Sequence, residues 1–277
     1  MNDSLQARAP LYVRVDGDGP ALLLLHGFTG SADSWDEVCP AWTATHRVIR
    51  PDLIGHGRSP APKELERYRM DAAVRELLEL LDGLGVHRFR LLGYSMGGRL
   101  ALHLALAAPG RVERLILESA TYGIADPAQR AARRAEDNQL AAWIETHGVD
   151  AFARRWAAHP LFATQGALPP ARRERQARER RMHSAVGLAN SLRGMGTGAQ
   201  ASLRDRLGEL KMPVLLIAGE YDEKFTALAR EMAALIPRAQ LAIVPGAGHN
   251  VHLEQPQAFA ERVSAFLAQE RKERSIV

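Results

Sequence analysis

Short apolar stretches rich in Leu, Ile and Val recur along the chain, and most are followed by a longer stretch with helical periodicity. This alternation is typical of βαβ units, which build a mostly parallel sheet flanked by helices. The predicted strands are Leu11–Asp16, Ala21–His26, Arg47–Pro51, Phe89–Gly93, Arg114–Glu118, Val214–Gly219 and Gln240–Pro245. The predicted helices are Asp71–Leu84, Met96–Ala108, Ala227–Leu235 and Gln257–Glu270. The link between the first two strands is too short for a crossover helix, so we predict an antiparallel hairpin there and parallel strands elsewhere.

One region departs from this alternation. Between about Asp126 and Arg206 no strand-like stretch occurs, only Ala- and Arg-rich helical sequence interrupted by prolines and glycines. Loops at the carboxyl edge of a parallel sheet carry ligand sites and tolerate long insertions. We therefore predict an α/β core, residues 1–122 and 207–277, with a helical cap, residues 123–206, inserted after one strand.

Composition excludes several classes of protein. The chain has 277 residues, 46% of them hydrophobic and 25% charged, which is enough for one large domain with a buried core. Its longest aliphatic stretch, Ala21–Leu25, is far shorter than the roughly 20 apolar residues that span a bilayer. The polar N-terminus shows no secretory signal, so we expect a cytoplasmic protein. The single cysteine, Cys39, rules out an internal disulfide and a multi-cysteine metal cluster, and no metal is expected.

Charge is concentrated in the predicted cap. The whole chain has a net charge of +4, whereas residues 126–206 contain 14 arginines, no lysine and 8 acidic residues. The overall balance is too even for general nucleic-acid binding. In the stretch from Arg172 to Arg181, Glu174 precedes Arg178 by four residues, a spacing typical of a salt-bridged solvent face. A basic cap over a slightly acidic core would raise the local concentration of an anionic substrate.

The residues Gly93-Tyr94-Ser95-Met96-Gly97 end a predicted strand and open a predicted helix. In this context Gly-x-Ser-x-Gly is a nucleophile elbow, in which small residues surround a sharply turned serine. The serine needs a base and the base needs an orienting carboxylate, each on a loop after a strand. Asp222 and His249 meet that requirement, and Glu118 and His252 are the alternative acid and base.

A developing negative charge also needs stabilising amides. We assign one to Met96, at the positive end of the elbow helix, and the other to Phe28, in the loop after the second strand. The stretch Gly55–Ser59 resembles a phosphate loop but lacks the lysine and the following helix that such loops require, so we interpret it as structural.

Several motifs resemble the α/β-hydrolase superfamily over essentially the whole chain and, within it, the menaquinone-pathway lyases known as 2-succinyl-6-hydroxy-2,4-cyclohexadiene-1-carboxylate (SHCHC) synthases. The motifs that carry the resemblance are HGFTGS at 26–31, GYSMGGR at 93–99, RRAED at 133–137, HPLF at 159–162, GLANSLRGMGTGAQ at 187–200, AGEYDEKF at 218–225 and GAGHNVHLEQP at 246–256. The elbow and histidine motifs are common to many relatives, whereas the long cap motif at 187–200 and Arg99, after the second elbow glycine, are much more selective. The loop at 119–123 lacks the proline expected there.

The resemblance implies a cofactor-free lyase that eliminates pyruvate from an enolpyruvyl cyclohexene dicarboxylate with a succinyl chain. It implies that Arg99 and Arg133 clamp substrate carboxylates, with Arg180 or Arg181 as a further candidate, and that Tyr94 and Trp156 line the pocket. In the mechanism we expect, His249, held by Asp222, deprotonates Ser95, whose alkoxide removes a ring proton. A serine hydrolase of anionic esters or C–C bonds would use the same triad, and a slow-turnover ligand receptor is a third reading.

Overall fold

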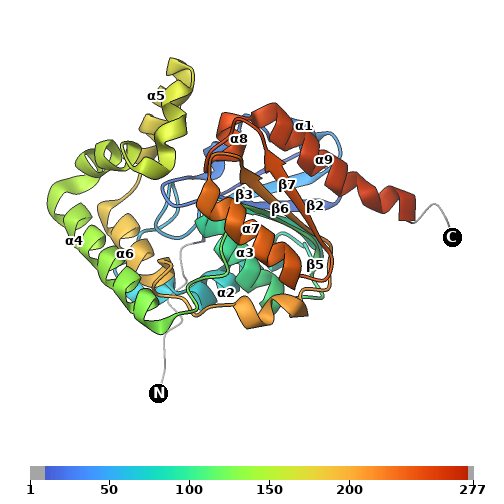
Figure 1. Cartoon of the computed structure of the whole chain (residues 1–277), viewed down its shortest axis with the longest axis horizontal. Helices are drawn as coiled ribbons and strands as arrows, with labels where there is room; N and C mark the ends of the chain where they lie inside the picture. Colours follow the sequence, from blue (N-terminus) through green and yellow to red (C-terminus); the bar gives the residue numbers. More distant parts are fainter. Residues whose placement is uncertain (1–9, 274–277) are drawn as a thin grey trace.

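The structure is a computed structural model that describes residues 10–273, and its strands form one seven-stranded sheet (Figure 1). The strands are β1 (Val13–Asp16), β2 (Ala21–Leu25), β3 (Arg47–Pro51), β4 (Phe89–Tyr94), β5 (Val112–Glu118), β6 (Val214–Gly219) and β7 (Ala239–Val244). Their order is β1-β3-β2-β4-β5-β6-β7, and all neighbours except β1 and β3 are parallel. The predicted fold class, a mostly parallel α/β sheet, is confirmed.

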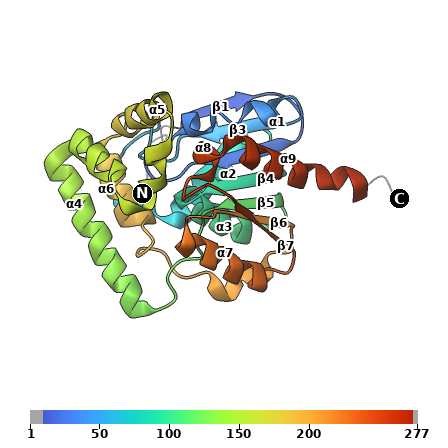
Figure 2. The same ribbon diagram turned by 45° about the horizontal axis from the view of Figure 1, so that its top comes forward.

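Helices cover both faces of the sheet (Figures 1 and 2). One face carries α2 (Met70–Gly83), α3 (Met96–Ala107) and α7 (Glu223–Leu235); the other carries α1 (Pro40–Thr43) and α9 (Pro256–Glu273). Each face has its own apolar core, because strands buried on both sides need apolar side chains in both directions. All residues of β2, β4 and β6 are accordingly buried.

The predicted hairpin between the first two strands is wrong. β1 pairs with β3, with Val13 opposite Pro51, and β2 lies between β3 and β4. The short link at residues 17–20 passes the end of β3, where the Gly17 Cα lies so close to the Thr43 carbonyl that a Cβ would come within 2.2 Å of its oxygen. The uniformly buried β2 belongs inside the sheet, whereas β1, with half-exposed side chains, suits the edge.

Between β5 and β6 the described chain contains no strand, and its helices lie beside the core at one end of the sheet (Figures 1 and 2). Prolines open several of these helices, as expected at a first helical position, and α4 bends at Gly148, where φ is 77°. The helices of this segment are α4 (Pro127–Ala157), η3 (Pro160–Ala167), α5 (Pro170–Arg181), α6 (Ala185–Met195) and η4 (Arg204–Glu209). The remaining short helices are η1 (Ala32–Trp35), η2 (Leu65–Tyr68) and α8 (Val251–Glu254).

Two predictions touch the chain ends. The polar stretch read as lacking a secretory signal falls in residues 1–9, and the end of the predicted core in residues 274–277, and both lie outside the described residues. Within residues 10–273, every helix is too short or too polar to cross a bilayer.

Candidate active site

Ser95 occupies a sharp turn between β4 and α3. Its φ of 50° and ψ of −107° place it in a region that residues with a side chain rarely adopt. A Cβ on Gly93 would come 2.3 Å from the Gly97 carbonyl oxygen, and one on Gly97 would come 2.2 Å from the Leu25 carbonyl oxygen. Only glycine fits at both positions, and the resulting turn places Ser95 at the carboxyl edge of the sheet.

His249 connects Ser95 to Asp222. The Nδ1 atom of His249 lies 2.6 Å from Asp222 Oδ2, and its Nε2 atom lies 3.0 Å from Ser95 Oγ. Asp222 follows β6 and His249 follows β7, and because these strands are parallel neighbours, their carboxyl ends meet. The histidine and the aspartate are buried. The arrangement lets the imidazole take the Ser95 proton while the carboxylate holds the ring in orientation.

The two residues predicted to supply amides line the cavity into which Ser95 opens. Phe28 lies in the loop after β2, and Met96 is the first residue of α3, so its N–H has no acceptor within the helix. Both lie beside Ser95 and His249 in the cavity wall. Backbone donors at this place can stabilise an oxyanion formed next to the serine.

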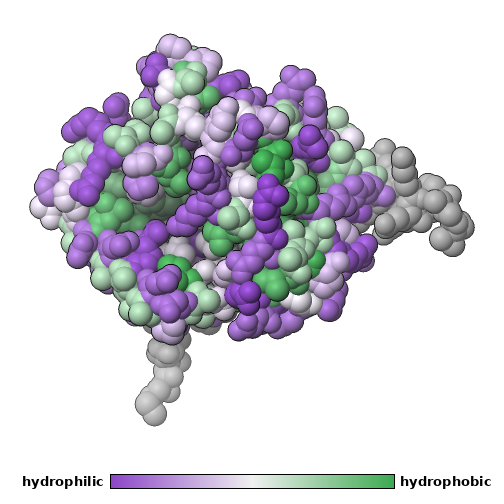
Figure 3. Space-filling view, viewed as in Figure 1, coloured by the Kyte–Doolittle hydropathy of each residue, from purple (hydrophilic) through white to green (hydrophobic). Residues whose placement is uncertain are grey.

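The cavity has a volume of about 790 Å³ and lies between the sheet edge and the helices of the insert. In Figure 3 a hollow with an apolar lining and a hydrophilic rim is visible beside the insert helices. Three of the side chains that the resemblance singles out, Arg99, Arg133 and Trp156, line this cavity. Its size is within the range of small-molecule sites, and its lining combines apolar surface with several cations and the two carboxylates of Glu136 and Asp137.

Arg99 is the more unusual of the two arginines. It is buried, and its Nη1 donates to the Met195 carbonyl at 2.6 Å and to Gln200 Oε1 at 2.5 Å, both neutral acceptors. Burial, with a contribution from Arg133, lowers the pKa of Arg99 to about 10. Arg133 is better paired, since its Nε donates to Asp137 at 2.8 Å. A buried guanidinium without a described carboxylate partner favours an anionic ligand.

Sequence reasoning missed other cavity residues. Arg155 lines the cavity with its guanidinium carbon 4.7 Å from the centre of the Trp143 ring, and Lys224 and His159 line it as well. Lys224 follows Asp222 by two residues, so its position directly after β6 could have indicated from the sequence that it lies near the site. Arg155 follows from the fold of the insert and had no such signal.

The comparisons with known proteins agree with this geometry. A family profile described as the alpha/beta hydrolase fold matches residues 20–256. A Bacillus subtilis (strain 168) protein named as a candidate 2-succinyl-6-hydroxy-2,4-cyclohexadiene-1-carboxylate synthase is 45% identical over 260 residues, which cover 91% of this chain and 93% of that protein. The synthase of that name from Serratia proteamaculans (strain 568) is 34% identical, with coverage of 91% and 94%. The chain belongs to the SHCHC synthase family of the α/β-hydrolase fold.

Solved structures show the same relationship. The structure of MenH from S. aureus superposes with a TM-score of 0.90 at 33% identity, covering 95% of this chain and 99% of that one. The enol-lactonase from Burkholderia xenovorans LB400 superposes with a TM-score of 0.81 at 26% identity, covering 94% and 96%. The scaffold of the SHCHC synthase family is thus shared with a hydrolase, and the chemistry has to be argued from the site.

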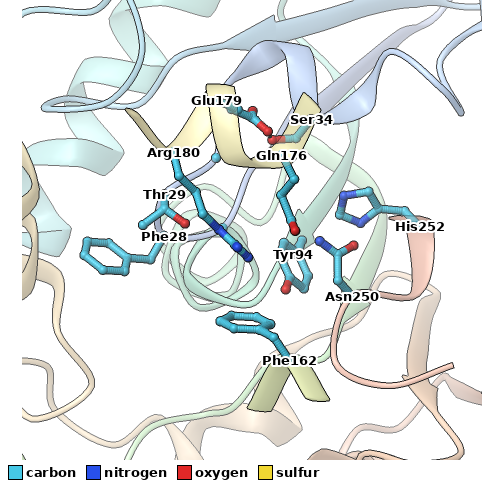
Figure 4. A pocket seen from close by; sticks show the side chains of 12 residues that line it. Phe28, Thr29, Ser34, Tyr94, Phe162, Gln176, Glu179, Arg180, Asn250 and His252 are labelled. Carbon is cyan, nitrogen blue, oxygen red and sulfur yellow. Dashed lines mark hydrogen bonds between the residues drawn. The ribbon is translucent and has the colours of Figure 1, made fainter. Parts of the chain in front are cut away.

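A second, smaller cavity adjoins the first (Figure 4). Phe28 lines both cavities, whereas Tyr94 lines only the smaller one. Arg180 reaches from α5 into it, with its guanidinium carbon 5.1 Å from the centre of the Phe162 ring, and burial lowers the pKa of Arg180. Arg181, by contrast, is exposed and lies 3.9 Å from Asp150. Of the two adjacent candidates in the insert, the structure directs Arg180 toward the site.

The alternative acid and base bind each other. Glu118 accepts from His252 through both carboxylate oxygens, at 2.7 Å from the Nδ1 atom and 3.0 Å from the backbone N–H. Both side chains are buried, and the His252 ring lies 4.4 Å from the Trp35 ring, centre to centre. The pair links α8 to the end of β5. Within residues 10–273, neither side chain bonds to Ser95 Oγ or lines the main cavity.

Proposed function

We propose that this protein eliminates pyruvate from 2-succinyl-5-enolpyruvyl-6-hydroxy-3-cyclohexene-1-carboxylate and releases SHCHC, in menaquinone biosynthesis. Membership of the SHCHC synthase family supports the reaction, and one structural observation carries it. Arg99 is a buried cation with neutral partners, in the same cavity as Ser95 and His249. The substrate carries three carboxylates, and Arg99 can bind one of them directly, because the nearby Asp137 carboxylate is paired with Arg133.

The reaction begins with a proton transfer. His249, oriented by Asp222, accepts the proton of Ser95 Oγ, and the alkoxide removes the ring proton next to the succinyl carbonyl. The electron pair moves through the ring double bond, the bond from the ring to the enolpyruvyl oxygen breaks, and the departing enol takes up a proton to become pyruvate. No water is consumed. The amides of Phe28 and Met96 stabilise the enolate oxygen of the succinyl group.

The cations divide the remaining work. Arg99 and Arg133 line the main cavity and bind carboxylates of the substrate; Arg180 serves a carboxylate or enolpyruvyl group that reaches the smaller cavity. Trp156 forms an apolar wall of the main cavity, and Tyr94 forms a wall of the smaller one. In this proposal residues 123–206 are the cap that carries Arg133, Trp156 and Arg180, and the rest of the chain is the core that carries the triad.

A serine hydrolase is the second candidate, favoured by the enol-lactonase that shares the fold. In that reaction Ser95 attacks a carbonyl carbon and water completes the cycle. Incubation with the enolpyruvyl substrate and, separately, with p-nitrophenyl acetate distinguishes the two, with pyruvate followed through lactate dehydrogenase and nitrophenol by absorbance. We expect rapid pyruvate release and slow nitrophenol release. Fast nitrophenol release without pyruvate would reject the lyase assignment.

A further inference from the structure

The segment 28–34, which we call the oxyanion loop, holds the proposed amide donor Phe28. It belongs to the core, yet its polar partners include side chains of the insert. The Nε2 atom of His183 lies 2.9 Å from the Thr29 carbonyl oxygen, and Glu179 Oε1 accepts from the hydroxyls of Ser31 and Ser34, each at 2.6 Å. Figure 4 shows Glu179 directed at Ser34 from α5, in the wall of the smaller cavity into which Arg180 points.

The oxyanion loop has a conformation that needs outside support. Thr29 has a φ of 67°, which is uncommon for a residue with a branched Cβ. The Gly30 N–H donates to the Gly27 carbonyl at 3.0 Å, which closes the turn around Phe28. A strained conformation persists only when surrounding contacts hold it, so the hydrogen bond to the Thr29 carbonyl helps to keep the Phe28 amide in place.

The hydrogen bonds also define the state of His183. Its Nδ1 accepts from the Gly57 N–H at 2.9 Å, so the proton is on Nε2, which donates to Thr29. The imidazole is neutral in this arrangement and joins two loops of the core through one residue of the insert. His183 is buried, and its ring lies 5.4 Å from that of His56, centre to centre.

We propose that His183 and Glu179 are positioning residues that hold the oxyanion loop, and with it the Phe28 amide, in its working geometry. The two residues lie near the end of α5 and on either side of Arg180, so one short segment of the insert both faces the smaller cavity and sets the proposed amide donor. This inference rests on the proposed function through the role of Phe28. Neither residue needs to touch the substrate.

Paired variants separate the proposed contacts from general effects on the insert. Glu179→Gln retains a carbonyl oxygen that both serine hydroxyls can reach, whereas Glu179→Ala loses it. His183→Gln can place an amide N–H near the position of Nε2 and keep the bond to Thr29, whereas His183→Asn reaches only toward Gly57. Glu174→Ala is the matched control, because Glu174 lies on the same helix, is exposed and pairs only with Arg178 among the described ion pairs.

We expect kcat for pyruvate release to fall about 10- to 100-fold in Glu179→Ala and His183→Asn, with KM changed less than about threefold, because a displaced oxyanion donor acts on the transition state. Glu179→Gln, His183→Gln and Glu174→Ala should stay within about threefold of the wild type. Equal losses in the alanine and glutamine variants, or a rise in KM that matches the fall in kcat, would overturn the proposal.

A readout that does not use the reaction separates this inference from the proposed function. Protein labelled with ¹⁵N-phenylalanine gives seven amide signals, and a Phe28→Leu variant assigns the one from Phe28. The Phe28 signal should shift in Glu179→Ala and His183→Asn and stay in place in Glu174→Ala, whether or not the enzyme makes pyruvate. An unmoved Phe28 signal in folded Glu179→Ala and His183→Asn would contradict the positioning role. If a His183 variant fails to fold, the Glu179 pair decides the question.

Discussion

Two histidines three residues apart make the same first contact and differ in the second. His249 and His252 each present Nδ1 to a buried carboxylate, at 2.6 Å from Asp222 and 2.7 Å from Glu118. The Nε2 of His249 then reaches Ser95 and the main cavity, whereas the His252 ring packs among Trp35, Tyr94 and Phe259 and borders only the smaller cavity. A histidine–carboxylate pair is therefore a structural or a catalytic unit according to what its second nitrogen can reach.

The largest effect is expected when the contact between His249 and Ser95 is removed. Ser95→Ala or His249→Ala should lower kcat for pyruvate release by about 10³–10⁶, since members of one catalytic unit act together. Far-UV circular dichroism and the thermal midpoint of these variants should match the wild type. The double variant should be no slower than the worse single one. A further multiplicative loss in the double variant would contradict a shared proton-transfer role.

The next comparison replaces the carboxylate of each pair by the corresponding amide. Asp222→Asn should lower kcat by about 10²–10⁴, because the amide no longer holds the ring in the required orientation and tautomer. Glu118→Gln should leave kcat within about tenfold, since Glu118 serves His252. Instead, urea unfolding should show a loss of about 2–4 kcal/mol, as expected when a buried pair loses one partner. Comparable kcat losses in both variants would show that the two pairs are not functionally distinct.

A smaller effect is expected from the cation of the catalytic cavity. Arg99→Ala should lower kcat/KM for the enolpyruvyl substrate about 10- to 100-fold, because a charge-assisted contact to a carboxylate is lost. Hydrolysis of p-nitrophenyl acetate, a neutral ester, should change far less. Arg99→Lys keeps the charge without the planar fork and should fall between the two. An equal loss on the neutral ester would remove Arg99 from the list of substrate ligands.

The smallest expected effect concerns stability and histidines remote from the triad. Burial lowers the pKa of His183 and of His103 to about 4, from an ordinary value of 6.5. Between about pH 4 and pH 6.5 the unfolded chain binds more protons at these histidines than the folded chain does. Their contribution to the free energy of unfolding is therefore fully present above about pH 6.5 and is lost as the pH falls toward 4. Each residue should account for about 2 kcal/mol of the free energy of unfolding lost at pH 5.

Urea unfolding followed by tryptophan fluorescence at pH 7.5, 6 and 5 measures this loss. Buried His26 and His56, whose pKa values burial also lowers, add to it in the same direction. His103→Gln should therefore reduce the dependence on pH, relative to the wild type, by the share of one histidine. A pH-independent free energy of unfolding over this range would contradict the assignment of these histidines as neutral and buried.

The parts of the fold that could be predicted are those with one dominant physical cause. The strands β2 to β7 follow from short stretches rich in apolar residues, and their parallel direction follows from the helices between them. The proximity of Ser95, Asp222 and His249 follows in turn, because each is placed after a parallel strand. The partner of β1 could not be predicted. The short link to β2 indicates that the chain reverses direction, but it does not show that β3 lies between β1 and β2.

The insert was predictable only as a helical segment. Its composition excludes strands, but the contacts of Glu179, Arg180 and Arg155 depend on how several separate helices pack, and arginine periodicity alone does not encode that packing. The bond between Glu118 and His252 is a similar case. Each was recognisable as a candidate for chemistry, and only the register of β5 against α8 shows that they satisfy each other.

The proposed elimination is tested most directly by the mass of the ring product formed in H₂¹⁸O. Elimination releases the ether oxygen with pyruvate, so we predict a cyclohexadiene that has lost that oxygen and carries no ¹⁸O at the vacated carbon. A ring product that retains a hydroxyl group at that carbon, with or without ¹⁸O, would mean that the enzyme adds water, and would contradict the account of Ser95 as a proton-abstracting base.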